Sequence, residues 1–169
     1  MDFSQGELTK IEEERIFIKK VGNAQYWVKP LFEYKNYPLG SIKSHKKYFQ
    51  MLKKYLNKHI PETRFIKFRK GITLIVQKHI FGKRVETLGE IERLIKLKQN
   101  RSFGNGLKKL LETKGWVIDM YVYKENFIAT KTKELFYIDG RMPVFSNSNE
   151  ERYGISKKRT LQLLRRISH

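Results

Sequence analysis

The sequence predicts an α+β fold with a small antiparallel sheet and one helix in its first half, followed by a reduced, mainly helical half that carries a short β-hairpin. Three observations lead to this prediction. Short β-prone runs occur in pairs around turn residues, and apolar residues between the pairs recur at helical spacing. The 169 residues are also 40% hydrophobic, which is enough for a packed core. We expect a sheet-plus-helix lobe over residues 1–82 and a reduced helical lobe over 83–169, together forming one compact two-lobed unit.

The first half begins with the β-prone runs Arg15–Lys20 and Gln25–Leu31, separated by a turn around Gly22. The next segment, Ser41–Asn57, carries apolar residues at helical spacing with lysines on its other side, which predicts an amphipathic helix.

Two further β-prone runs, Thr63–Arg69 and Thr73–Ile80, follow across a Lys-Gly turn. They complete the predicted sheet of the first half.

The second half begins with a helix whose start is marked by Thr87 and Glu90, the spacing of a capping box. We expect a break at Asn100–Gly106, after which helical spacing resumes until Gly115.

The end of the chain predicts two short strands, Phe127–Thr130 and Leu135–Ile138. A polar segment over 146–154 then leads to a last helix that begins near Ser156.

Composition excludes several classes of protein. Because cysteine is absent, a disulfide framework and a thiolate metal site are excluded, and the sequence is compatible with a reducing, cytoplasmic compartment. The opening segment contains Glu12–Glu14 and no long apolar run, so we expect neither a signal peptide nor a membrane span. The four histidines lack the spacing of a zinc site.

A formal net charge of +19 predicts attraction to polyanions, such as nucleic acid, nucleotide phosphates or an anionic membrane surface. Aromatic and basic residues alternate over 64–69, a pattern that fits stacking on single-stranded nucleic acid and fits a half-buried strand equally well. Lysine richness can also follow from the base composition of the genome, so charge alone does not identify the partner.

The segment Gly115–Pro143 holds the most informative polar residues, Asp119, Asn126 and Asp139, at the ends of short apolar runs. Carboxylate and amide oxygens are ligands that magnesium prefers. Asp and Asn are also ordinary turn formers, so a turn is the favoured explanation for each residue taken alone, and the prediction depends on their arrangement.

The order of the elements and several short motifs resemble protein-kinase-like folds, closest to the aminoglycoside-phosphotransferase-like or small-molecule-kinase-like branch. The run TLIVQKHIFG from Thr73 to Gly82 resembles the strand and hinge that join the two kinase lobes. Asn126 with the apolar residues after it resembles the end of the catalytic loop, and Tyr137-Ile138-Asp139-Gly140 resembles the metal-binding Asp-Phe-Gly position.

This resemblance implies a binding site for ATP and Mg²⁺. By resemblance, Lys29 would hold the α- and β-phosphates and the backbone at Gly22 would cover them. Gln77 to His79 would line the adenine edge through backbone groups.

In the second half, the resemblance implies that Asn126 and Asp139 bind magnesium and that Asp119 orients or accepts the acceptor hydroxyl. These roles belong to an ATP-dependent phosphotransferase with an unknown acceptor.

The sequence also departs from the family pattern. No acidic residue lies between Glu33 and Glu62, so the helix after Lys29 offers no glutamate to pair with it. Asp119 precedes Asn126 by more residues than the family's catalytic loop has, and Tyr121 stands at the family's position. Only about thirty residues follow the 139 position.

We therefore expect a minimal kinase-like protein, either an active phosphotransferase or a binding-only pseudokinase. The alternatives are a basic nucleic-acid-binding protein and a partner-docking protein.

Overall fold

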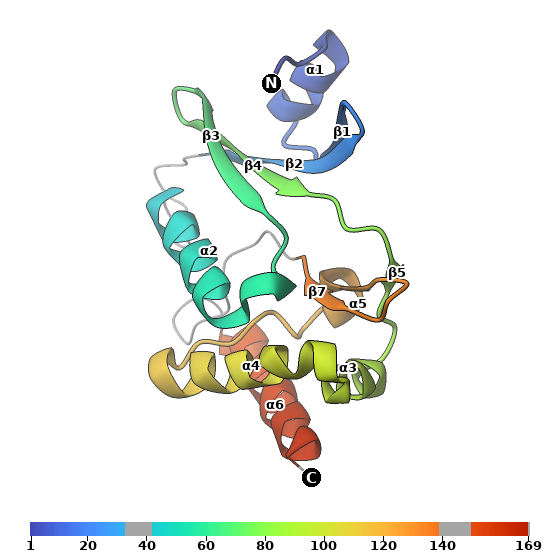
Figure 1. Ribbon diagram of the computed structural model, residues 1–169. Helices are drawn as coiled ribbons and strands as arrows, with labels where there is room; N and C mark the ends of the chain where they lie inside the picture. Colours follow the sequence, from blue (N-terminus) through green and yellow to red (C-terminus); the bar gives the residue numbers. More distant parts are fainter. Residues whose placement is uncertain (33–41, 139–149, 169) are drawn as a thin grey trace. The chain divides into compact units, whose positions relative to one another are not determined.

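The computed structural model describes residues 1–32, 42–138 and 150–168, which form two compact units (Figure 1). The first unit comprises Met1–Lys47 and Pro61–His79, and the second comprises Tyr48–Ile60 and Ile80–His169. Residues 48–60 therefore group with the second unit, although they lie inside the first predicted lobe by sequence. None of the described helices is long and apolar enough to span a membrane.

The first unit is built on a four-stranded antiparallel sheet of β1 (Phe17–Val21), β2 (Ala24–Phe32), β3 (Thr63–Arg69) and β4 (Ile72–Lys78), in the order β1-β2-β4-β3. The predicted strands are thus confirmed, with ends shifted by a few residues. Gly22, at the first position of the β1–β2 turn, has a φ of +58°. Glycine adopts this conformation without strain, and it suits the twist of a two-residue hairpin.

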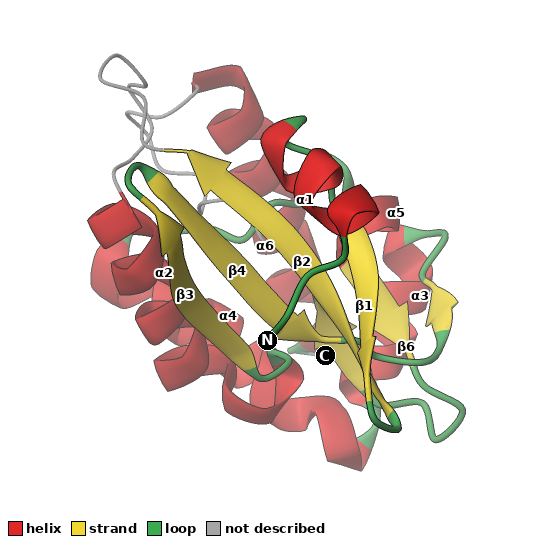
Figure 2. Cartoon of the chain, turned by 90° about the horizontal axis from the view of Figure 1, so that it is seen from above, coloured by secondary structure: helices red, strands yellow, loops and turns green. Residues whose placement is uncertain are grey.

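One face of this sheet is covered by α1 (Gln5–Glu12), a helix that the sequence analysis missed (Figure 2). Its signal is a capping box: the Glu7 backbone N–H lies 3.4 Å from Ser4 Oγ, while Glu7 Oε2 accepts from the Ser4 backbone N–H. Ile11 of α1 is fully buried against Phe17 and Val28. Because strand side chains alternate, the neighbours of Val28 along β2 face the other side of the sheet.

The helix α2 (Ile42–Leu56) confirms the amphipathic helix expected over 41–57. From Tyr48 onward it belongs to the second unit, where Tyr48, Leu52 and Leu56 are buried. A 3₁₀ turn, η1 (Asn57–His59), follows it and contacts β7.

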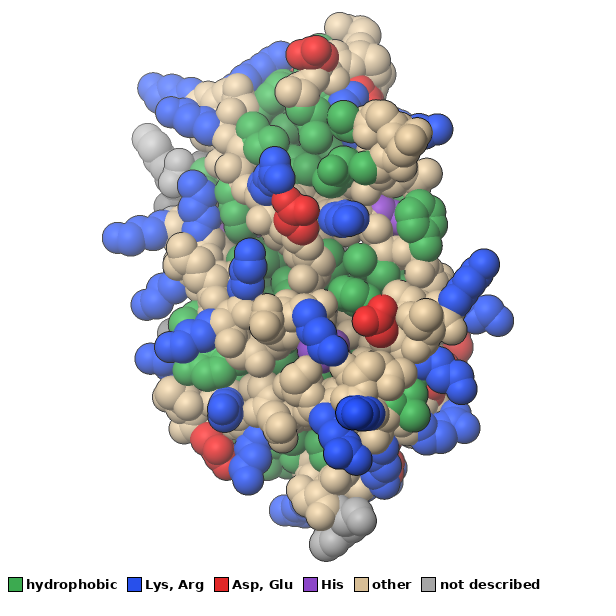
Figure 3. Space-filling view, in the orientation of Figure 1, with side chains coloured by type: hydrophobic (Ala, Val, Ile, Leu, Met, Phe, Trp, Pro, Cys, Tyr) green, Lys and Arg blue, Asp and Glu red, His purple; other side chains and the backbone are tan. Residues whose placement is uncertain are grey.

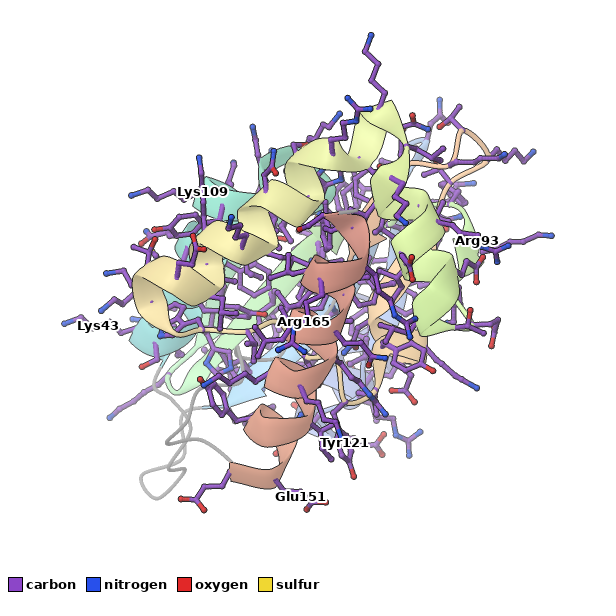
Figure 4. The ribbon with its side chains drawn as sticks, turned by 90° about the horizontal axis from the view of Figure 1, so that it is seen from below. Lys43, Arg93, Lys109, Tyr121, Glu151 and Arg165 are labelled. Carbon is purple, nitrogen blue, oxygen red and sulfur yellow. The ribbon has the colours of Figure 1, made fainter. Side chains whose placement is uncertain are left out.

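The second unit also contains α3 (Leu88–Lys96), α4 (Arg101–Lys114), α6 (Glu150–Ile167) and a three-stranded antiparallel sheet. The sheet has the order β5 (Lys83–Arg84), β6 (Phe127–Ala129), β7 (Leu135–Tyr137), and a single turn of helix, α5 (Tyr123–Asn126), leads into β6. The predicted β6–β7 hairpin is confirmed, whereas β5 is too short to show a period in the sequence. Seen from below, α6 lies between α3 and α4, both of which it contacts (Figure 4).

Half of the predicted capping box at the start of α3 is present. The Glu90 backbone N–H donates to Thr87 Oγ1 at 3.1 Å, but the Glu90 carboxylate accepts from the Glu86 backbone N–H instead of that of Thr87. At the end of α4, Gly115 has a φ of +62° and terminates the helix as expected.

Two expectations for this unit were wrong. The break expected over Asn100–Gly106 covers only η2 (Lys98–Asn100), and α4 runs through Gly104 and Gly106. These glycines are sites of close approach: a Cβ at Gly106 would lie 2.1 Å from the Tyr55 carbonyl oxygen. The last helix begins at Glu150 and not near Ser156, because the acidic residues of its first turn suit a helix N-terminus.

Candidate functional site

The predicted site residues lie in both units, and Asp139 lies outside the described residues. In the first unit, Lys29 on β2 donates from Nζ to Gln77 Oε1 on β4 at 2.9 Å. Gln77 is buried, and its Nε2 donates in turn to Thr63 Oγ1 on β3 at 3.2 Å. A buried amide on the neighbouring strand therefore accepts a hydrogen bond from Lys29.

Trp27 lies on the same sheet face as Lys29 and Gln77, because it stands opposite Gln77 in the strand register and two residues before Lys29. Its ring is 5.4 Å from that of His79, and burial lowers the pKa of His79. The indole N–H of Trp27 is buried and has no hydrogen-bond partner among the described residues. Buried polar atoms in proteins are usually satisfied, so this N–H is an exception within the first unit.

The backbone after β4 is already engaged within the first unit. The N–H of Lys78 donates to the Glu62 carbonyl at 2.8 Å, and that of His79 donates to the Gln25 carbonyl at 2.9 Å. Any contact of His79 with a base must therefore use its ring or its carbonyl oxygen.

The second unit contains the loop of Asp119–Asn126, which is tightly held. Asp119 is fully buried, and its Oδ1 accepts from the Tyr121 backbone N–H at 2.9 Å while its Oδ2 forms an ion pair with Arg152 of α6. The Asp119 backbone N–H donates to the Tyr137 hydroxyl at 3.0 Å. Both carboxylate oxygens of Asp119 are thus in use.

Asn126 is held in one orientation by this loop. Its Nδ2 donates to the Asp119 carbonyl oxygen at 3.0 Å, and its own carbonyl accepts from the Ile138 N–H at 2.9 Å, which fixes the residue next to the 139 position. Its Oδ1 has no hydrogen-bond partner among the described residues and can accept one bond or ligate a cation.

The helix α6 supplies the contacts that sequence reasoning missed. Besides Arg152, Ser156 Oγ accepts from the Met120 N–H at 3.1 Å, and Arg159 donates to the carbonyl oxygens of Met120 and Tyr121 at 2.6 and 2.8 Å. The spacing of 152, 156 and 159 places all three on one side of α6. The glutamates at 150 and 151 are typical of a helix N-terminus. They could have indicated that the last helix begins before Ser156 and includes Arg152.

The oxygen side chains of the described residues fit magnesium only if a bound nucleotide supplies further ligands. The described residues contain no group of three His, Asp or Glu side chains that could hold a metal ion by themselves. Magnesium on a nucleotide needs only one or two protein oxygens, with phosphates and waters as its other ligands. Asn126 Oδ1 and a carboxylate at Asp139 would be sufficient.

Comparison with known proteins gives a match by structure and none by sequence. No protein-family model matches the chain, and no curated protein matches it significantly. The structure of the kinase PK-1 of Cydia pomonella granulovirus matches it with a TM-score of 0.51 and 12% sequence identity. That match covers 84% of this chain and 58% of the viral one.

The chain has a kinase-like fold. At this low identity the match establishes the fold alone, and the chain spans about 58% of the viral kinase's length. The resemblance expected from the sequence is confirmed at this level. The kinase-like fold also explains why the chain carries a sheet with one long helix before a helical unit with a small hairpin.

Proposed function

We propose that this kinase-like protein binds ATP together with Mg²⁺. The observation that carries this proposal is the Asn126 side chain. Its amide nitrogen donates to the Asp119 carbonyl, and its Oδ1 has no hydrogen-bond partner among the described residues. A side chain held in this way is preorganised to ligate a cation, since its orientation needs no further ordering. Asp139 is proposed as the second ligand.

In the first unit, Lys29 is proposed to bind the phosphates. Its ammonium group is positively charged, and its bond to Gln77 Oε1 holds it on the same sheet face as Trp27. The turn at Gly22 is proposed to cover the phosphates, because a residue without a side chain lets the backbone approach them closely. The ring of His79 beside Trp27 is proposed to contact the adenine, and Gln77 acts by holding Lys29.

Magnesium would neutralise phosphate charge, and the residues of the loop would position the acceptor. Asp119 is the proposed catalytic residue, which orients the acceptor hydroxyl. One observation favours a second candidate, a binding-only pseudokinase: the Asp119 carboxylate is fully buried and engaged by Arg152. For Asp119 to accept a proton, Arg152 would have to release it.

Ligand-induced stabilisation tests the nucleotide site. A ligand that binds only the folded protein at about 100 times its Kd raises the free energy of unfolding by roughly 2.7 kcal/mol. We expect ATP with Mg²⁺ to raise the unfolding midpoint of the wild type, and Lys29→Met, Asn126→Ala and Asp139→Ala to abolish this rise. The matched controls Lys20→Met and Asn105→Ala, both at exposed positions, should keep it.

The rise is compared with each variant's own ligand-free midpoint, because Asn126→Ala also removes a hydrogen bond within the loop. No rise in the wild type at ATP concentrations of several millimolar would refute the proposal. If ATP binds, formation of ADP in the wild type and its loss in Asp119→Asn would identify an active phosphotransferase. Binding with no ADP formation would identify a pseudokinase.

A further inference from the structure

The exposed side of α2 consists almost entirely of lysine. The exposed positions within Ile42–Leu56 are Lys43, Lys46, Lys47, Gln50, Lys53 and Lys54. They recur every three or four residues and therefore lie on one side of the helix. We call the five lysines the α2 lysine stripe.

The α2 lysine stripe has no ion-pair partner among the residues that the structure describes. Each of the helices α3, α4 and α6 has, by contrast, at least one paired cation: Lys96 and Arg166 pair with Glu92, Lys108 with Glu112, and Arg152 with Asp119. Arg159 is engaged by backbone carbonyls.

The sequence explains this difference, since it has no acidic residue between Glu33 and Glu62. Lys43 thus has Lys46 and Lys47 as its neighbours one turn away, and like charges at these spacings destabilise an isolated helix. Repulsion within the stripe therefore destabilises the helix alone, and an anionic partner would reduce this repulsion.

We propose that the α2 lysine stripe binds the phosphodiester backbone of double-stranded nucleic acid. From Lys43 to Lys54 the helix rises by roughly 16 Å at ~1.5 Å per residue. A duplex carries about one negative charge per 1.7 Å, so the same length presents several phosphates to the five ammonium groups. Lysine is a flexible point charge and suits contacts that follow the backbone without recognising a base.

The composition of the stripe argues for this partner over the others. It exposes no aromatic ring on which an unpaired base would stack. It exposes no apolar residue that would insert into a membrane surface or form the core of a protein interface. Phe68, one of the aromatic residues in the basic-aromatic run of β3, packs in the core of the first unit against Phe3.

The figures show basic side chains at the surface. Figure 4 shows Lys43 extending outward from α2. On the face drawn in Figure 3, Lys and Arg side chains are far more numerous than Asp and Glu. The proposal involves one helix and does not depend on nucleotide binding.

The salt dependence of binding tests the stripe. The affinity for a fluorescent duplex of about 25 base pairs would be measured by anisotropy between roughly 50 and 300 mM NaCl, without ATP or magnesium. The test variant is Lys46→Gln/Lys47→Gln/Lys53→Gln. Each lost phosphate contact reduces the slope of log K against log salt by about 0.9, so we expect the slope to become shallower by about 2 to 3.

The matched control removes the same charge from α4, as Lys108→Gln/Lys109→Gln/Lys114→Gln, at positions that are also exposed. It should change the slope by less than about one. Gln and Lys have similar helix propensity, and circular dichroism would confirm that both variants are folded.

Equal slopes for the two variants would overturn the proposal, because binding would then follow total charge and not this helix. Tighter binding to single strands than to the duplex, or binding to anionic vesicles with no binding to nucleic acid, would also overturn it. Loss of slope in the α2 variant alone would establish the stripe as the contact surface.

Discussion

The His59 imidazole is a titratable group used as a structural tie in the second unit. Its Nδ1 lies 2.8 Å from the Leu135 carbonyl oxygen and its Nε2 lies 2.8 Å from Ser102 Oγ. Because a carbonyl can only accept, Nδ1 carries the proton and Nε2 accepts from the serine. Burial lowers the pKa of His59, and the positive charge of Lys58 lowers it further. The Leu135 carbonyl and Glu134 raise it, but the net shift is downward.

His59 should make stability depend on pH. Since its pKa is lowered in the folded protein, the unfolded chain takes up the proton more readily, and the free energy of unfolding falls as pH decreases below about 6.5. The contribution of His59 to the free energy of unfolding is fully present above pH 6.5. It is lost completely only at a pH below the pKa of His59 in the folded protein. Denaturant unfolding of the wild type between pH 7.5 and 5 would measure it.

His59→Gln should reduce this pH dependence. His79 adds to it in the same direction, because burial also lowers its pKa, so His79→Gln should remove a further part. A wild-type stability that rises on acidification over this range would contradict the assignment.

The helix α2 has no acidic residue that could pair with Lys29, and in the first unit the Gln77 side chain accepts a hydrogen bond from Lys29 instead. Gln77 is neutral, so it orients the ammonium group while leaving its charge uncompensated by that contact. An ammonium group that a neutral amide orients in this way is electrostatically suited to a phosphate.

The helices of the second unit approach each other closely at glycine. A Cβ at Gly106 of α4 would lie 2.1 Å from the backbone oxygen of Tyr55, which cannot move aside as a side chain could. A Cβ at Gly154 of α6 would have no atom within 4 Å.

Alanine at these two glycines should therefore have opposite effects. Gly106→Ala should lower the free energy of unfolding by about 2 kcal/mol or more, since the overlap outweighs the helix propensity that alanine gains. Gly154→Ala should raise it by roughly 0.5–1 kcal/mol. Denaturant unfolding of both variants is the measurement, and a stabilising Gly106→Ala would show that the two helices can separate without cost.

Most elements of this fold could be predicted from local patterns. The strands of both hairpins, α2 and the start of α3 follow from alternation, helical spacing and a Thr87 cap, all of which act over short range. The break before α4 was placed too late because glycine's low helix propensity was given more weight than its role in close packing. The helix α1 was missed although Ser4 and Glu7 carry its signature.

The candidate site was predictable only in part. Asn126 was recognised by its place before an apolar strand. Its orientation depends on the Asp119 carbonyl, and the loop as a whole depends on Arg152 and Ser156, which lie more than thirty residues away. Such long-range hydrogen bonds leave no period in a sequence, so only the three-dimensional structure identifies them.

At the scale of the whole molecule, the kinase-like fold is reached with 12% identity to the viral kinase and with no match to a family model. The fold depends on apolar volume and its alternation more than on particular residues. Similar architecture and dissimilar sequence are therefore compatible.

The net charge of +19 should make the folded protein sensitive to ionic strength. Most ion pairs between described residues are at least partly exposed and contribute little, whereas the excess positive charge repels itself throughout the compact state. Raising NaCl from roughly 20 to 300 mM should therefore raise the unfolding midpoint by a few degrees, as the Debye length shortens.

Thermal unfolding without nucleotide or nucleic acid would measure this effect. The α4 variant with three lysines replaced should gain less from salt. A midpoint that falls with salt would mean that attraction within the ion pairs exceeds the repulsion.

The contacts that α6 makes with the Asp119–Asn126 loop determine when that loop can form. Arg152, Ser156 and Arg159 reach back over separations of 33 to 39 residues, so the loop cannot adopt its final geometry until α6 has docked on the second unit. Closing such long loops is slow and costs chain entropy. A nascent chain that had already formed the first sheet would still lack the loop geometry of the candidate metal site until residues 150–167 had been synthesised and had folded.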